Sequence, residues 1–116
     1  ADSLDLPFLC ADVTPRALRV PEGAAAVHEN GVRGVARVVV GVDSLAESVE
    51  RYRALLGTEP EADGRTFVLS GSQVSLEQVY RRQGLPEIEL CAASPAKCGP
   101  LPVRLAHGAA ITIVAC

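Results

Sequence analysis

The stretch "GVARVVVGVD", residues 34–43, decides the fold because it reads as one buried β-strand with a single charged residue inside it. Side chains of a strand point alternately to its two faces. A strand over residues 35–42 therefore carries on one face Val38, Val40 and Val42. Arg37 lies on the opposite face, beside Val39, so we expect the two faces of this strand to have different surroundings.

A helix is predicted directly after this strand, over residues 44–56. Ser44 and Glu47 have the S-x-x-E spacing of a capping box, and Gly57 supplies a natural end to the helix. Glu47 and Arg51 are spaced to pair on the exposed side. One apolar stripe recurs at helical spacing, formed by Leu45, Val49, Tyr52 and Leu56.

Further strands follow the helix, and three are expected over residues 65–70, 74–80 and 87–93. The first two form a hairpin through "GSQ". Residues 94–102 hold three prolines and predict a loop, and two short strands over 103–106 and 109–116 close the chain. The order is β-α-β-β-β with extra terminal strands, which indicates an α+β fold with a mixed sheet and one main helix on one face.

The core of this unit is expected between the helix and the sheet. Its predicted members are Val38, Val40, Leu45, Val49, Tyr52, Leu56, Val68 and Leu76. The sheet face without a helix is predicted to be polar, because Arg37, Ser75 and Glu77 have the strand parity that places them there. A polar face of this kind serves as a binding cup or docks on another unit.

Composition restricts the class of protein. The chain has 116 residues, 48% of them hydrophobic and only 3% aromatic, and its net charge is −3. One domain of this size can bury a core of aliphatic side chains. The acidic balance argues against nucleic acid, since the only basic cluster is Arg81-Arg82. No segment has the length and hydropathy of a membrane span or a leader, so we expect a cytoplasmic protein or one whose leader has been removed.

The four cysteines are Cys10, Cys91, Cys98 and Cys116. None forms a C-x-x-C pair, and their density is below that of small secreted scaffolds. We therefore expect free thiols, with a Cys91–Cys98 disulfide as the alternative.

Residues 1–33 predict a connector or arm, and residues 34–116 the folded unit. The segment 5–21 holds three prolines without a sustained period, and Asn30-Gly31 is a turn signal. More than 30 residues without regular structure is unusual inside a compact domain. We expect this segment to pack along another surface.

The unit resembles the vicinal oxygen chelate superfamily, which includes glyoxalase I, bleomycin-resistance proteins and extradiol dioxygenases. The resemblance covers residues 28–92 and rests on an apolar strand followed by Asp43, a helix with Tyr52 in its second half, and Leu56-Gly57. The turn His28-x-Asn-Gly is similar to that of the glyoxalase-like subgroup. In this family two such units form one cup, which implies a homodimer or a second, N-terminal half-module as partner.

The resemblance also implies a metal ligand, usually His, at the position that Arg37 occupies. Arginine stays protonated and has no free acceptor, so it cannot ligate a cation. Glu77 matches a later carboxylate ligand of the family and is the only, weak, metal candidate, while Thr112 stands where the last carboxylate would fall. We expect Arg37 and Glu77 to face each other as an ion pair. Arg37 is then either structural, or it holds an anionic ligand.

The predicted ligand-binding residues are Arg37, Glu77, Ser75 and His28. His28 and His107 both lie in turns, where a surface or capping role is more common. Glu87 and Glu89 share a strand face, and an exposed sheet edge would explain them. No catalytic residue is assigned.

Two functions remain open. The first is a glyoxalase-like small-molecule binding module, or a degenerate half-module, without an intact metal site. The second is a metal-dependent lyase, isomerase or dioxygenase whose ligands, for a divalent metal, are completed by another unit or subunit. No cofactor follows with certainty from these residues, and the substrate is not determined by them.

Overall fold

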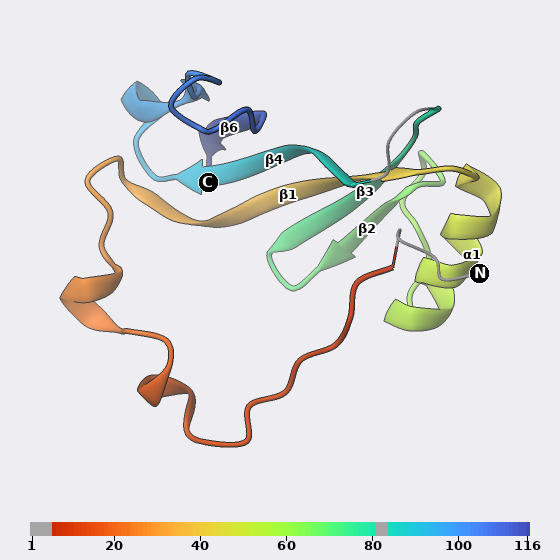
Figure 1. The fold of residues 1–116 in the computed structure, drawn as a ribbon, viewed down its shortest axis with the longest axis horizontal. Coiled ribbons are helices and arrows are strands. Elements are labelled where there is room, and N and C mark those ends of the chain that lie inside the picture. Colours follow the sequence, from red (N-terminus) through yellow and green to blue (C-terminus); the bar gives the residue numbers. More distant parts are fainter. Residues whose placement is uncertain (1–5, 81–83) are drawn as a thin grey trace.

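The computed structural model describes residues 6–80 and 84–116 and shows one mixed sheet with one α-helix. The strands are β1 (Val32–Val42), β2 (Thr66–Leu69), β3 (Ser72–Gln78), β4 (Gly84–Ala92), β5 (Gly99–Pro100) and β6 (Ile111–Ala115). Their order across the sheet is β2-β3-β1-β4-β6-β5 (Figure 1). β1 pairs in parallel with β3, and β4 in parallel with β6, while the other neighbours are antiparallel. The α+β unit with a mixed sheet and one main helix is therefore confirmed.

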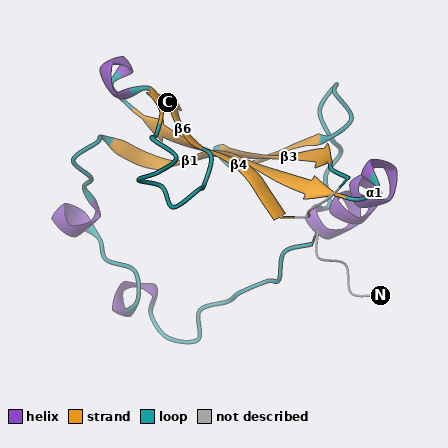
Figure 2. Cartoon of the chain, turned by 45° about the horizontal axis from the view of Figure 1, so that its top comes forward, coloured by secondary structure: helices purple, strands orange, loops and turns teal. Residues whose placement is uncertain are grey.

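The helix α1 (Leu45–Leu56) lies on one face of the sheet (Figure 2). Ser44 occupies the N-cap position, but its side chain makes no capping hydrogen bond, so the predicted capping box is wrong. The end is as expected: Gly57 adopts φ +66° and its N–H donates to the carbonyl of Arg53 at 2.9 Å. A residue with a Cβ is strained at that φ, which explains glycine there.

The core lies between α1 and one face of β1, β2 and β3. Its buried members are Val40, Val42, Val49, Tyr52, Phe67 and Leu76, with Val38, Leu45, Leu56 and Val74 packed against them. The rings of Tyr52 and Phe67 stack with centroids 6.0 Å apart. Most of the predicted core is confirmed, but the prediction of Val68 as a core residue is wrong. The adjacent residue Phe67 is fully buried instead, whereas Val68 is 46% exposed on the opposite face of the sheet.

The hairpin of β2 and β3 turns at Ser70-Gly71, since Leu69 pairs with Ser72. This turn is one residue earlier than the predicted "GSQ", and Gly71 adopts φ +85° in it. The expected strand at 103–106 is wrong. Pro102 begins a series of turns there, and His107 and Gly108 both adopt positive φ. A short strand, β5, forms instead within the predicted loop 94–102.

The cysteine prediction is also wrong. Cys91 in β4 forms a disulfide with Cys116, and only Cys10 and Cys98 are free thiols. The parallel register of β4 and β6 places Cys91 opposite Val114 and brings the two cysteine Cα atoms within 4.9 Å. Cys91 and Cys116 have a sequence separation of 25, and this spacing does not indicate that they are close in the fold.

Residues 6–31, which we call the arm, contain only two short 3-10 turns and form a wide loop whose first residues return toward β2 and α1 (Figures 1 and 2). Asp12 pairs with Arg16 and Arg19 inside the arm. The basic pair Arg81-Arg82 lies outside the described residues. In the described part of the chain, no helix has the length and apolar character needed to cross a membrane.

Candidate functional site

The helix-free face of the sheet carries the charged side chain that interrupts β1. Arg37 makes a two-point ion pair with Glu89 of β4: Nε donates to Oε2 at 3.0 Å, and Nη2 donates to Oε1 at 3.1 Å. The side chains are 33% and 22% exposed, so the pair is partly buried. Two parallel bonds of this kind hold the guanidinium in a fixed orientation.

The expected Arg37–Glu77 ion pair is therefore wrong. In the strand register Arg37 faces Gln73 of β3, while Glu77 faces Gly41, four positions further along. Four residues of extended chain correspond to about 13 Å. Glu89 lies directly across from Arg37 on β4 and forms the pair instead. β4 is an interior strand, so the exposed-edge explanation of Glu87 and Glu89 is also wrong.

On the same face of the sheet, a hydrogen-bonded network lies on β2, β3 and the turn before β2, across β1 from β4. Asp63 accepts hydrogen bonds from the N–H groups of Arg65 (3.0 Å) and Thr66 (2.9 Å) and from the Thr66 hydroxyl (2.5 Å). The pKa of Asp63 is lowered from its ordinary 3.8, first by the Thr66 hydroxyl and then by the Arg65 N–H. The Thr66 and Ser75 hydroxyls are 2.9 Å apart. Because the Thr66 proton goes to Asp63, Ser75 donates in this second bond and keeps its lone pairs as acceptors.

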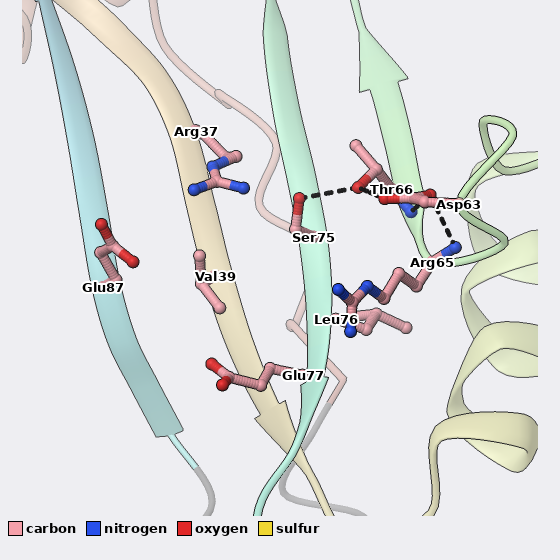
Figure 3. A pocket seen from close by; sticks show the side chains of 9 residues that line it. All are labelled: Arg37, Val39, Asp63, Arg65, Thr66, Ser75, Leu76, Glu77 and Glu87. Carbon is pink, nitrogen blue, oxygen red and sulfur yellow. Dashed lines mark hydrogen bonds between the residues drawn. The ribbon is translucent and has the colours of Figure 1, made fainter. Parts of the chain in front are cut away.

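These groups surround a cavity of about 220 Å³ on the helix-free face. Figure 3 shows its lining, which comprises Arg37, Val39, Asp63, Arg65, Thr66, Ser75, Leu76, Glu77 and Glu87. Among the described residues, Glu77 and Glu87 have no ion-pair partner at hydrogen-bonding distance. The cavity therefore offers several acceptors and two guanidiniums, that of Arg65 and that of Arg37, of which Arg37 is already paired with Glu89.

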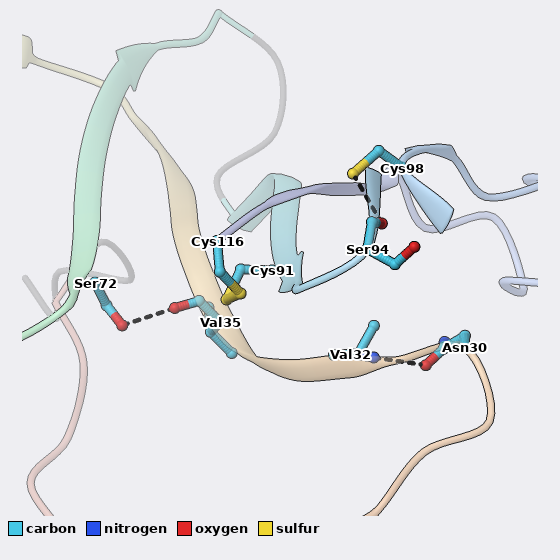
Figure 4. The surroundings of a disulfide bond; sticks show 8 residues. All are labelled: Asn30, Val32, Val35, Ser72, Cys91, Ser94, Cys98 and Cys116. Carbon is cyan, nitrogen blue, oxygen red and sulfur yellow. Dashed lines mark hydrogen bonds between the residues drawn. A yellow bond between two sulfur atoms is a disulfide. The ribbon is translucent and has the colours of Figure 1, made fainter. Parts of the chain in front are cut away.

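The structure brings together three of the four predicted ligand-binding residues, namely Arg37, Ser75 and Glu77. His28 lies apart from them. It lines a second cavity of about 360 Å³ between the arm and the start of β1, together with Asn30 and Leu90. Asn30 holds the turn there by accepting a hydrogen bond from the Val32 N–H at 3.1 Å (Figure 4).

Sequence reasoning missed Asp63, Thr66 and the role of Glu89. Asp63 lies in a turn before β2, so strand parity did not place it on either face. Glu87 and Glu89 did carry a signal, because their two-residue spacing puts both on one sheet face. Only the pairing of β4 beside β1 shows that this face is the one with Arg37.

The residues of the cavity do not fit a resident metal. Across residues 6–80 and 84–116, no three His, Cys, Asp or Glu side chains are grouped so that they could hold a metal ion. Arg37, which stands where the vicinal oxygen chelate resemblance implies a histidine ligand, is bound to Glu89. Thr112 is paired with Glu89 across β4 and β6 and supplies a hydroxyl where the resemblance implies a carboxylate.

No family model and no curated protein matches the chain. Among solved structures, methylmalonyl-CoA epimerase from Mycobacterium tuberculosis superimposes with a TM-score of 0.57 and 16% sequence identity, over 76% of this chain and 91% of that chain. The fold is glyoxalase-like. The glyoxalase-like fold that the vicinal oxygen chelate resemblance implied is therefore confirmed.

Proposed function

We propose that this glyoxalase-like domain binds a small polar molecule in the cavity on the helix-free sheet face, without a metal ion of its own. The observation that carries the proposal is the set of charged side chains on this face, since Glu77 and Glu87 line the cavity without forming ion pairs among the described residues. Carboxylates without an ion-pair partner among the described residues can accept hydrogen bonds from a ligand.

The lining favours a ligand that donates hydrogen bonds. Glu77, Glu87 and the Ser75 hydroxyl are acceptors, the guanidinium of Arg37 is directed to Glu89, and Arg65 is the remaining cation of the lining. The Arg37–Glu89 pair supports a positioning role for Arg37 rather than an anion site. At about 220 Å³ the cavity is smaller than most drug-binding pockets, which favours a compact amine or the amine end of a larger molecule.

Calorimetric titration with putrescine, and separately with acetate, tests this proposal. We expect putrescine to bind and Glu77→Gln to weaken its binding by about tenfold, because one charge-assisted hydrogen bond is lost. Glu22→Gln, which changes an exposed carboxylate in the arm, is the control and leaves binding unchanged. Binding of acetate but not of putrescine would overturn the proposed ligand class and restore the anion site at Arg37.

A metal-dependent lyase, isomerase or dioxygenase is the second candidate, favoured by the likeness in fold to a solved protein that is an epimerase. Because the residues of this chain do not fit a metal, the ligands would come from another unit, either a second copy or an N-terminal half-module. Metal analysis of the purified protein separates the two candidates. Stoichiometric, tightly bound Ni, Zn, Fe or Mn supports the enzyme, and its absence supports the binding module.

A further inference from the structure

The cavity beside His28, which we call the turn cavity, lies on the opposite face of the sheet from the cavity of the proposed function. Val35 of β1 pairs with Leu90 of β4, and both residues line the turn cavity. Leu90 follows Glu89 in β4, so its side chain points away from the face that carries the Arg37–Glu89 pair. The volume of about 360 Å³ falls within the range of about 300–1,000 Å³ that is typical of small-molecule sites.

The apolar part of this lining is not covered by the helix. It consists of Ala26, Val32, Val35 and Leu90. Val35 is 44% exposed although β1 is an interior strand, and the core cluster under α1 includes no residue of β4. Apolar side chains that stay accessible inside a cavity can remove the hydrocarbon part of a ligand from water.

A cation lines the same cavity. Arg33 is the extra residue at a bulge of β1, because Val32 pairs with Ala92 whereas Gly34 pairs with the adjacent Cys91. A bulge interrupts the alternation of side chains and re-aims the side chain of the extra residue. Arg33 is exposed and forms no ion pair among the described residues. Its guanidinium can therefore donate two parallel hydrogen bonds to an anionic group.

A closed turn holds a second donor beside Arg33. The N–H of Gly31 donates to the carbonyl of His28 at 2.9 Å, and Gly31 adopts φ +75°, which favours glycine. The side-chain oxygen of Asn30 accepts a hydrogen bond from the Val32 N–H at 3.1 Å (Figure 4). These two bonds fix the His-x-Asn-Gly turn at the start of β1 and place His28 in the lining. An imidazole can donate a hydrogen bond whether it is neutral or protonated.

The charge of the lining selects the kind of ligand. Among the described residues, Arg33 is the one charged side chain of the turn cavity, and no Asp or Glu lines it. Glu29 lies in the turn but is exposed and is not part of the lining. An anionic group is therefore favoured here, in contrast to the acidic cavity on the other face.

We propose that the turn cavity binds an amphipathic carboxylate, with its carboxylate group on Arg33 and His28 and its aliphatic chain on Val35 and Leu90. The proposal goes beyond the proposed function and does not rest on it. A neutral apolar molecule would gain no ion pair with the guanidinium, and an amine would be repelled by it.

Calorimetric titration with octanoate, and separately with 1-octanol, tests the proposed ligand class. We expect octanoate to bind, 1-octanol to bind at least about tenfold more weakly, and Arg33→Gln to weaken octanoate binding by about tenfold, because a charge-assisted hydrogen bond is lost. Arg104→Gln is the matched control, since Arg104 is exposed and lies outside the lining. Octanoate that fails to bind, or that binds Arg33→Gln as tightly as the wild type, overturns the proposal.

A second pair of variants tests the position of the aliphatic chain. Val35→Asp places a carboxylate beside the proposed chain and should abolish octanoate binding. Val68→Asp makes the same change at a residue that is 46% exposed on the other face of the sheet, and it should leave binding intact. Thermal melts of both variants check that they are folded. Equal octanoate binding by the two folded variants contradicts the proposal.

Nuclear magnetic resonance locates the bound octanoate without any substitution. The amide signals of residues 30–35 should shift when octanoate is added, because the turn and the first part of β1 line the turn cavity. The amide signals of Thr66 and Glu77 should stay in place. Shifts at Thr66 and Glu77 instead would assign the anion to Arg65 in the other cavity and overturn the proposal.

Discussion

The two faces of β1 have different surroundings, although both belong to the same eleven-residue strand. Toward α1, Val38, Val40 and Val42 pack with the stacked rings of Tyr52 and Phe67. Away from it, Arg37 forms an ion pair with Glu89 beside a cavity lined by acidic side chains. One face stabilises the fold, and the other carries groups that can bind a ligand.

This contrast teaches that the stability of the domain is concentrated on the helix side. Apolar burial there contributes free energy with every side chain that leaves water. Partly exposed ion pairs contribute much less, because solvent screens them. Exposed polar side chains of the helix-free face, such as Glu77, therefore contribute less to stability than the apolar side chains packed against α1.

The largest expected effect compares neighbours on β2. Phe67→Ala should lower the free energy of unfolding by about 3–5 kcal/mol, because it removes a fully buried ring from the core. Val68→Ala, on the opposite face, should cost less than about 1 kcal/mol. Urea unfolding measures both, and similar losses in the two variants would break the distinction between the faces.

The next effect concerns the cross-link between β4 and β6. Cys116→Ser should lower the free energy of unfolding by about 3 kcal/mol, since the disulfide closes a loop with a sequence separation of 25. Cys98→Ser changes an exposed free thiol and is the control. Unfolding without reductant measures both.

A smaller effect is expected at the Arg37–Glu89 pair. Arg37→Ala and Glu89→Ala should each cost about 1–2 kcal/mol, because the partner charge is left partly buried, and the double variant should cost less than the sum. Glu77→Ala should be nearly neutral for stability. If instead Arg37→Ala is coupled to Glu77→Ala in a double-mutant cycle, the pairing read from the register is wrong.

The smallest effect is pH-dependent and involves Asp63. The Thr66 hydroxyl holds the pKa of this carboxyl below its ordinary 3.8 in the folded protein. Its contribution to stability is therefore present above about pH 4 and is lost as the pH falls through the lower, folded-state pKa. We expect Asp63→Asn to flatten the acid side of the stability profile, measured by thermal melts. An unchanged profile would remove Asp63 from the network.

Local periodicity explains what was predicted well. The apolar stripe of α1, the end at Gly57 and the alternation along β1 depend on residues close together in the sequence. These signals were enough to place the helix on one face and Arg37 on the other. They also supported the family resemblance whose fold the solved neighbour confirms.

Errors arose where strands had to be paired. The four residues of β2 show no clear alternation of apolar and polar side chains. Their register against β3 therefore decides that Phe67 faces inward and Val68 outward. Glu89 and Cys91 both depend on β4 lying between β1 and β6. The spacing of these residues along the chain does not indicate which strands are neighbours in the sheet.

The sequence by itself thus determined the α+β class, the helix, the buried face of β1 and the presence of a charge on its other face, because each follows from the period of side chains along a single element. Only the tertiary structure decided the partner of that charge, the lining of the cavity and the Cys91–Cys116 bond. These depend on the register between strands, which arises from packing across the whole sheet.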